Sequence, residues 1–203
     1  MLSANRKETL HAVILSVSAA DRLLKGRDKV ACLSRLARQA LACCARKNGI
    51  ALGRLPKDEN GAPLPMGGYF WSLSHKTSYV GAVMARTRIG IDIEKIRPVI
   101  APMYQKVADP AEWQLGSGDR QDLFFRYWTA KEAVLKSSSA GLADLSRCRI
   151  DGILDRHHLT IDYDGRKWTV EHFYFDDHLA AVVSSGQKIE WTLRADESAP
   201  SGK

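Results

Sequence analysis

The last third of this sequence, after Gly141, consists of short strand-like runs separated by turn residues. Asp164-Gly165, between two of these runs, is a strong signal for a two-residue β-hairpin turn. Runs of this length and spacing predict strands. The predicted strands cover residues 148–154, 158–163, 167–175, 179–184 and 189–193. The fold must therefore contain a sheet built from this end of the chain.

The first half also contains strand-like runs, and one long amphipathic segment lies among them. Residues 28–47 are predicted to form a helix, because apolar side chains such as Leu33 and Leu41 recur at helical spacing and Asn48-Gly49 is a stop signal. Strands are predicted at residues 11–17, 69–73, 79–85 and 89–94. The last two flank residues 86–88, which predicts a short hairpin connection between them.

Beyond a Pro-flanked break at residues 98–110, a second long helix is predicted at 120–137, with a shorter one near 109–115. Each half of the chain therefore combines strands with one long helix, which predicts an α+β fold. We expect an N-terminal half at residues 1–97 and a C-terminal half at 98–194. The polar residues 195–203 are expected to be a disordered tail.

The formal charge of +7 and the pI of about 9.3 favour acidic partners, such as a phosphate-rich small molecule, an acidic protein, nucleic acid or an anionic membrane. The sequence contains no run of five or more like charges, so a nucleic-acid-binding arm is not indicated. No stretch approaches the ~18 apolar residues that a membrane helix needs. The segment 10–20 fits either a short signal peptide or a first strand. The four cysteines lack a C-x-x-C pair, which favours buried reduced thiols in a cytoplasmic protein over zinc or disulfides.

Three short segments can carry chemistry. In Gly90-Ile91-Asp92-Ile93-Glu94 the alternation of a strand places both carboxylates on one face, where they can share a hard cation. Read alone, this pair is equally an ordinary polar strand face. Glu132 lies four residues after Trp128 and three before Leu135, at the margin of the apolar stripe, where a charge needs a partner. Read alone, Glu132 and Lys136 form an ordinary surface salt bridge.

The third segment is Ser72-Leu73-Ser74-His75-Lys76, at a predicted strand end. Its hydroxyl, imidazole and ammonium groups can bind phosphate, although His75 alone could equally be a loop histidine with local partners.

Taken together, the three segments resemble the signature motifs of the 4′-phosphopantetheinyl transferases of the broad-specificity, surfactin-synthetase-activating type. The matching stretches are Ser-Leu-Ser-His, Gly-Ile-Asp-Ile-Glu-Lys-Ile-Arg-Pro and Trp-Thr-Ala-Lys-Glu-Ala-Val-Leu-Lys, in this order, and the resemblance covers roughly residues 30–142. It implies two pseudo-symmetric halves, each a small antiparallel sheet packed with a long helix, in a monomer that binds coenzyme A in the cleft between them.

The resemblance also implies a role for each matching residue. Asp92, Glu94 and Glu132 match the family's ligands for Mg²⁺, or alternatively Mn²⁺. Asp92, Glu132 and Lys136 are the implied catalytic residues, with Glu132 as base and Lys136 on the leaving phosphate. The implied contacts with coenzyme A come from Arg35, Ser74, His75, Asp92, Lys131 and Lys136, with Arg27 as a further candidate, and Glu112 is a candidate near the metal.

The resemblance implies transfer of 4′-phosphopantetheine from coenzyme A to a serine of an apo acyl or peptidyl carrier protein, without nucleic acid or membrane as partner. One position departs from the family, because Ala62 stands where the family has a phosphate-binding lysine, and Lys57, Lys76 or Arg54 are candidate substitutes. Three other interpretations stay open: a metal-dependent phosphoesterase or nuclease, a basic nucleic-acid-binding module without catalysis, and an inactive member of the family.

Overall fold

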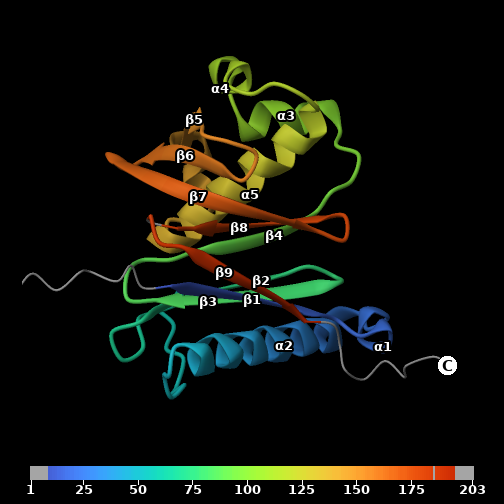
Figure 1. Cartoon of the computed structure of the whole chain (residues 1–203). Helices are drawn as coiled ribbons and strands as arrows, with labels where there is room; N and C mark the ends of the chain where they lie inside the picture. Colours follow the sequence, from blue (N-terminus) through green and yellow to red (C-terminus); the bar gives the residue numbers. More distant parts are fainter. Residues whose placement is uncertain (1–8, 185, 195–203) are drawn as a thin grey trace, which may run out of the picture.

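The strands sort into two sheets, and each sheet carries one long helix on its outer face (Figure 1). The computed structural model describes residues 9–184 and 186–194 of the chain. The first sheet has the order β2-β3-β1-β9, formed by Phe70–His75, Tyr79–Ala85, Leu10–Ser16 and Ile189–Arg194. The second has the order β4-β8-β7-β6-β5, formed by Ile91–Lys95, His178–Val183, Arg166–Phe175, His158–Tyr163 and Arg149–Ile153. The predicted α+β class is confirmed.

Strand β1 is one of the two inner strands of the first sheet. It pairs antiparallel with β3 and parallel with β9, and this second pair is the one parallel pair among the described strands. A parallel partner has to arrive by a long crossover, and β9 comes from the far end of the chain. The segment that fitted a signal peptide or a strand equally well in sequence is therefore a strand over residues 10–16.

Helix α2 (Gly26–Lys47), which follows the short helix α1 (Ala19–Arg22), covers the outer face of the first sheet. It buries one stripe of small and medium apolar residues against β1 and β3, while its arginines and lysines face outward. The buried stripe comprises Cys32, Leu33, Ala37, Ala40, Leu41, Cys44 and Ala45. The four cysteines are free, and burial raises the pKa of Cys44 and Cys148 to about 12, as expected for inert structural thiols.

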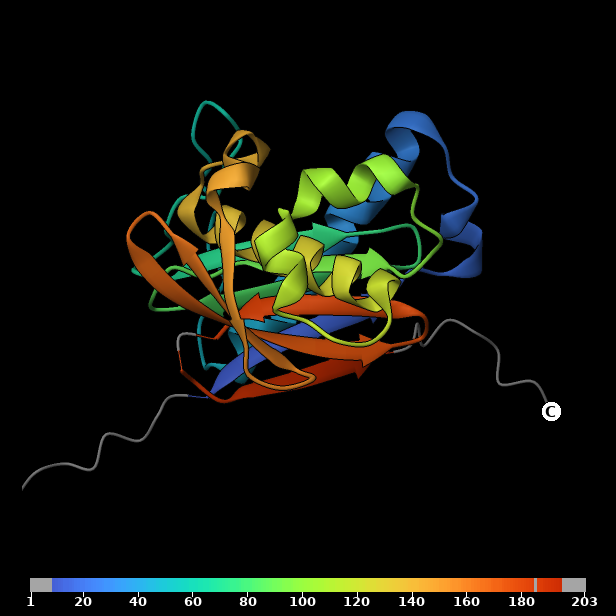
Figure 2. The same ribbon diagram turned by 90° about the horizontal axis from the view of Figure 1, so that it is seen from above.

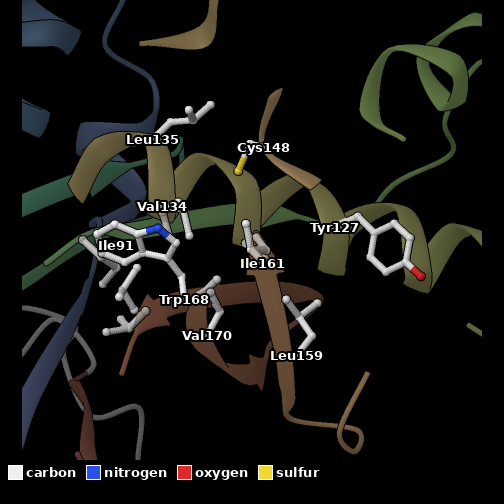
Figure 3. Close-up of a cluster of buried hydrophobic side chains, with 14 of the residues drawn as sticks. Ile91, Tyr127, Val134, Leu135, Cys148, Leu159, Ile161, Trp168 and Val170 are labelled. Carbon is white, nitrogen blue, oxygen red and sulfur yellow. The ribbon is translucent and has the colours of Figure 1, made fainter. Parts of the chain in front are cut away.

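Helix α5 (Arg120–Ser138) begins at Asp119, whose carboxylate accepts the Asp122 N–H, and packs on the second sheet. Most of its residues are buried, because the sheet covers one side and helix α3 packs on another. Figure 3 shows Val134 next to Trp168 and Val170 of β7, whereas Leu135 lies on the opposite side of the helix. A separate apolar cluster, which includes Ile14, Ile93 and Phe175, fills the space between the two sheets.

The predicted break at residues 98–110 is wrong in part, because it contains helix α3 (Ala101–Val107). Pro102 lies in the first turn of α3, where a missing N–H costs nothing, so this proline starts a helix rather than interrupting the chain. The helix predicted near 109–115 is α4 (Pro110–Gln114), and a 3-10 helix, η1 (Leu142–Arg147), follows α5.

The predicted hairpin at residues 86–88 is also wrong. Strand β3 already has β1 and β2 on its two edges, so β4 leaves the first sheet and pairs with β8 in the second. Gly90 lies at this crossing, where a β-carbon would come within 1.8 Å of the Ala133 carbonyl oxygen on α5. The hairpin at Asp164-Gly165 is confirmed: both residues have positive φ, and Tyr163 pairs with Arg166.

The division at residue 97 stays a prediction, but two strands lie across it. β4 comes from the first half of the chain and joins the second sheet, while β9 comes from the second half and joins the first sheet. The predicted tail at 195–203 lies outside the described residues. Among the described residues, none of the helices has the length and apolarity needed to cross a membrane.

Candidate metal centre and adjoining cavity

Strand β4 presents two acidic side chains at the edge of the second sheet. Asp92 and Glu94 alternate with Ile91 and Ile93, so both carboxylates lie on one face while the isoleucines pack in the core. The two acidic residues are only 2% and 9% exposed. Burying a charge is costly unless it has partners, so their neighbours decide what this face can do.

Helix α5 supplies a third carboxylate. One oxygen from each of Asp92, Glu94 and Glu132 lies within 4.8 Å of the other two. The Glu132 side chain is 15% exposed and lies at the margin of the buried face of α5. Three carboxylates at this separation repel one another unless positive charge lies among them.

Two serines of β2 fix the edge of β4 below this cluster. Ser72 accepts the N–H of Ile91 at 3.2 Å, and Ser74 accepts the N–H of Ile93 at 3.1 Å. These hydroxyls satisfy N–H groups on the edge of β4 that has no partner strand. Because Ser74 also donates to Asp92 Oδ1 at 3.0 Å, the first sheet positions a carboxylate of the second.

Each β4 carboxylate uses one oxygen for its protein donors. Lys136 Nζ lies 2.6 Å from Asp92 Oδ1, the oxygen that also accepts the serine hydroxyl. Lys76 Nζ lies 2.7 Å from Glu94 Oε1, and the Trp128 indole N–H donates to that same oxygen at 2.9 Å. The second oxygen of each carboxylate receives no hydrogen bond from any described residue, and Asp92 Oδ2 is fully buried in that state.

This donor set fits a hard divalent cation such as Mg²⁺ or Mn²⁺. Such ions take oxygen ligands, and a buried carboxylate oxygen without a partner is costly unless something binds it. Asp92, Glu94 and Glu132 are the residues that would hold the ion. Burial, followed by the nearby Asp92 carboxylate, raises the pKa of Glu132 to about 7, although Lys136 opposes this shift.

A cavity of about 830 Å³ opens beside the cluster, between the two halves of the chain. Figure 2 shows the loop of residues 55–68 beside η1 at the end of the molecule where both contribute to this cavity. The wall includes Trp71 of β2 and Leu135 of α5, and Glu132 and Lys136 connect the cavity to the acidic cluster. The space is large enough for a nucleotide-sized ligand.

The charged lining of the cavity is mainly positive. The cationic side chains of Arg38, Lys57 and Lys136 face it, together with the His75 imidazole, against the one carboxylate of Glu132. Neither the Arg38 side chain nor the Lys57 side chain has a hydrogen bond or ion pair with any described residue. Partial burial, followed by the ammonium groups of Lys136 and Lys76, lowers the pKa of His75, so its imidazole is neutral at neutral pH. Unpaired cations in a cavity favour an anionic ligand.

The structure brings most of the predicted site residues together. Ser74, Asp92, Glu94, Glu132 and Lys136 form the cluster, and His75 lies at the cavity beside it. Arg35 and Arg27 are exposed residues of α2 that do not line the cavity. The arginine of α2 that does line it is Arg38, one turn beyond Arg35.

Lys131 and Glu112 lie away from the acidic cluster in a buried ion pair of their own, although the resemblance implied Lys131 as a contact of coenzyme A and Glu112 as a residue near the metal. Lys131 Nζ lies 2.6 Å from Glu112 Oε1 and donates to the Val107 carbonyl at 2.7 Å, with its side chain 1% exposed. Successive residues of a helix point about 100° apart, so Lys131 faces α3 and α4 while Glu132 faces β4.

Sequence reasoning did not assign Ser72, Trp128 or Arg38 a place in this site. It also did not predict that Lys76 contacts Glu94. Lys57 and Lys76 were candidate substitutes at Ala62, and the structure separates them: Lys57 lines the cavity beside Ala62, whereas Lys76 binds Glu94. Strand alternation could have indicated Ser72, because it shares a face with Ser74. No sequence pattern indicates that the Trp128 indole reaches Glu94.

Comparisons with known proteins all find similarity to 4′-phosphopantetheinyl transferases, over different parts of the chain. A family model described as the 4′-phosphopantetheinyl transferase superfamily matches residues 88–183. The 4′-phosphopantetheinyl transferase HetI of Nostoc is 36% identical over 90 residues, which is 41% of this chain and 38% of that protein. A putative 4′-phosphopantetheinyl transferase of Haemophilus influenzae is 29% identical over 168 residues, 72% of this chain and 67% of that protein. A 4′-phosphopantetheinyl transferase of Bacillus subtilis is 30% identical over 77 residues, 36% of this chain and 34% of that protein.

Proposed function

Because the chain belongs to the 4′-phosphopantetheinyl transferase superfamily, we propose that it transfers 4′-phosphopantetheine from coenzyme A to a serine of an apo acyl or peptidyl carrier protein. The observation that carries this proposal is the acidic cluster of Asp92, Glu94 and Glu132 at the edge of a cationic cavity. A polyphosphate ligand needs positive charge along its length, and this site offers it both as side chains and as a place for a cation.

Asp92, Glu94 and Glu132 would hold Mg²⁺ or Mn²⁺ through the oxygens that protein donors leave free. A divalent ion bound there would neutralise negative charge on the pyrophosphate oxygens. Ser74 and Lys136 keep the Asp92 carboxylate turned so that its second oxygen remains available. This is the orienting role that outer contacts have at metal sites.

In the reaction, the carrier serine oxygen forms a bond to the β-phosphorus of coenzyme A, and the bond from that phosphorus to 3′,5′-ADP breaks. The serine proton has to be removed, and Glu132 is the proposed acceptor because it lines the cavity. Lys136 also lines the cavity, where its ammonium can stabilise the negative charge that develops on the leaving phosphate.

The nucleotide end of coenzyme A would lie toward Arg38, Lys57 and His75. Lys57 pairs with Pro63 across a tight loop, and Ala62 also lines the cavity. We therefore assign to Lys57 and Arg38 the phosphate contact that the family makes through a lysine at the position of Ala62. The net charge of +7 favours encounter with an acidic carrier domain, with a marked dependence on salt.

The test incubates the protein with coenzyme A, Mg²⁺ and several apo carrier domains, and weighs each carrier by mass spectrometry. A gain equal to one phosphopantetheine is expected, and it should be lost in Glu132→Gln, which keeps the shape of the side chain without its charge. The matched control is Glu190→Gln on β9, which removes the same charge away from the site. No mass gain on any carrier, or full activity of Glu132→Gln, would contradict the proposal.

A further inference from the structure

Lys76 is held at the acidic cluster by a single contact of its side chain. It follows β2 directly, and its backbone N–H donates to the Tyr79 carbonyl at 2.8 Å, which fixes the main chain in the turn between β2 and β3. Its ammonium lies 2.7 Å from Glu94 Oε1 and has no other hydrogen-bond partner among the described residues. The side chain is 38% exposed, so it can leave Glu94 without disturbing the turn.

Lys136, the other lysine of the cluster, is held much more firmly. Its ammonium contacts Asp92 Oδ1 at 2.6 Å, the Ile91 carbonyl at 3.2 Å and Ser74 Oγ at 3.3 Å. Three acceptors satisfy the three N–H bonds of an ammonium group, so Lys136 has little reason to move. The two lysines therefore differ: Lys136 is fixed by three partners, whereas Lys76 neutralises Glu94 through a single ion pair.

A divalent cation bound to Glu94 would lie close to the Lys76 ammonium, and the two positive charges would repel each other. Lys76 does not itself line the cavity, but Glu94, which it contacts, has an oxygen within 4.8 Å of one of Glu132, and Glu132 lines the cavity proposed to take the phosphates. Phosphate is a stronger partner for an ammonium group than a carboxylate that a metal ion already binds. A ligand phosphate at this end of the cavity thus gives Lys76 an alternative partner.

We propose that Lys76 makes binding of the divalent cation and of the phosphate-bearing substrate depend on each other. Lys76 neutralises Glu94 while the cavity holds no phosphate, and moves to a phosphate oxygen when it does, which leaves Glu94 to the cation. The cation then binds weakly when the substrate is absent and tightly when it is present. By thermodynamic linkage, the cation raises the affinity for the substrate by the same factor. This inference rests on the proposed function, because it takes the ligand to be polyanionic.

Trp128 decides the direction of the effect. Its indole N–H holds the same oxygen of Glu94 at 2.9 Å, so Glu94 stays oriented when Lys76 leaves. Removal of the lysine charge should therefore strengthen binding of the cation to the free protein. If Lys76 instead served mainly to position Glu94, its removal would weaken that binding.

The experiment measures binding of Mn²⁺ to the full chain by titration calorimetry, with and without coenzyme A, at fixed ionic strength. Lys76→Met removes the charge and keeps the length of the side chain. Lys95→Met is the matched control, because Lys95 is the exposed residue that follows Glu94 on β4, one position out of phase with the acidic face. Without coenzyme A, Lys76→Met should bind Mn²⁺ about fivefold more tightly than the wild type.

In the same experiment, the factor by which coenzyme A raises the affinity for Mn²⁺ should be smaller in Lys76→Met than in the wild type and in Lys95→Met. Mn²⁺ affinity that is unchanged or weaker in Lys76→Met, an unchanged coupling factor, or no Mn²⁺ binding by any of the three proteins would overturn the proposal. The outcome is separable from that of the transfer assay. If Lys76 shows the expected coupling but no carrier gains mass, the transfer function fails and the coupling stands.

Discussion

The Trp128 indole donates to the oxygen of Glu94 that Lys76 also contacts, but a phosphate cannot displace this neutral donor. Trp128→Phe keeps an aromatic ring, which can still stack on Phe124, and removes only the N–H. Because Glu94 then loses the bond that orients it, we expect Mn²⁺ affinity and transfer kcat/KM to fall about tenfold. Titration calorimetry and steady-state kinetics measure the loss, and the Tm should change little.

The matched control is Trp113→Phe on α4, which also removes an indole donor, here to the Ala108 carbonyl at 3.0 Å. Trp113 contacts none of the acidic cluster, so Mn²⁺ affinity should be retained in this variant. Equal effects of the two substitutions would mean that loss of an indole donor anywhere disturbs the protein, and that Trp128 has no special role at Glu94.

His172 makes the stability of the fold depend on pH. Its ring is completely buried between the carbonyl oxygens of Arg126 and His157, and burial, followed by the Arg126 charge, lowers the pKa to about 4 from 6.5. Below pH 6.5 the unfolded chain takes up a proton that the folded protein does not. The free energy of unfolding therefore falls as pH drops from about 6.5 to about 4, by roughly 2 kcal/mol from this group at pH 5.

Urea unfolding at pH 7.5 and pH 5 measures this dependence. His172→Gln can still donate to a carbonyl oxygen but does not titrate, so the variant should lose about 2 kcal/mol less on acidification than the wild type. Other groups titrate in the same range, and the comparison between the two proteins cancels their contribution. Equal losses in both proteins would contradict the role of His172.

At the residue scale, the family resemblance implied the three carboxylates as one set, and the local geometry of each agrees with the cluster that they form. Asp92 and Glu94 share a face through strand alternation, and Glu132 lies at a helix margin. The same helical spacing could have corrected the assignment of Lys131, which lies four residues after Tyr127 and three before Val134, both fully buried. The partners of Lys76 and Trp128 depend on how separate elements meet, which no local pattern contains.

At the element scale, Gly90 controls how closely β4 approaches α5. A β-carbon at this position would come within 1.8 Å of the Ala133 carbonyl oxygen, which is backbone and cannot move alone. Gly90→Ala should therefore push β4 away from α5, at a cost of about 3 kcal/mol in the free energy of unfolding. Since Asp92 and Glu132 lie on these two elements, Mn²⁺ binding should weaken as well. Urea unfolding and calorimetry measure the two effects.

Gly53→Ala is the control for this substitution. A β-carbon at Gly53 would have Met66 Sδ at 3.6 Å as its nearest contact, which is ordinary van der Waals packing. This variant should unfold within about 0.5 kcal/mol of the wild type. A Gly90→Ala protein that is as stable as Gly53→Ala, with normal Mn²⁺ affinity, would show that the strand and helix are not held at this distance.

The buried pair of Lys131 and Glu112 holds α4 and β5 against α5. Glu112 Oε1 accepts both the Lys131 ammonium and the Ile150 N–H at 2.7 Å. Lys131→Met leaves the Glu112 charge buried without its partner, so we expect a loss of about 3 kcal/mol by urea unfolding, partly recovered by adding Glu112→Gln. Coenzyme A affinity of the folded variant should be unchanged. A fall in that affinity with stability intact would return Lys131 to the site.

The elements themselves were mostly predictable, because period and turn residues are local signals. Asp164-Gly165 specifies its own turn through two residues with positive φ, so that hairpin was predicted correctly. Residues 86–88 also looked like a hairpin turn, but both edges of β3 were taken by β1 and β2. Distant segments compete to pair with each strand, and the residues of a turn do not determine which of them succeeds.

At the scale of the whole molecule, the two halves exchange strands. β4 carries Asp92 and Glu94 into the second sheet, and β9 returns to pair with β1 in the first. The acidic cluster lies where the exchanged strand β4 of the second sheet meets β2 of the first, and the cavity opens beside it. The order of the predicted elements indicates two halves that each combine a helix with strands, but it contains no information on this exchange of strands.

Because of the exchange, neither half should be stable alone. A fragment of residues 1–97 would contain β4 without its partner β8, and would leave the edge of β1 exposed where β9 pairs. An unpaired edge of an inner, mostly buried strand favours aggregation rather than folding. We expect the full chain to unfold in one calorimetric transition, and the fragments 1–97 and 98–203 to lack cooperative melts by circular dichroism until they are mixed. A cooperative melt of either fragment alone would show that the halves are independent domains and that the exchanged strands contribute little to their stability.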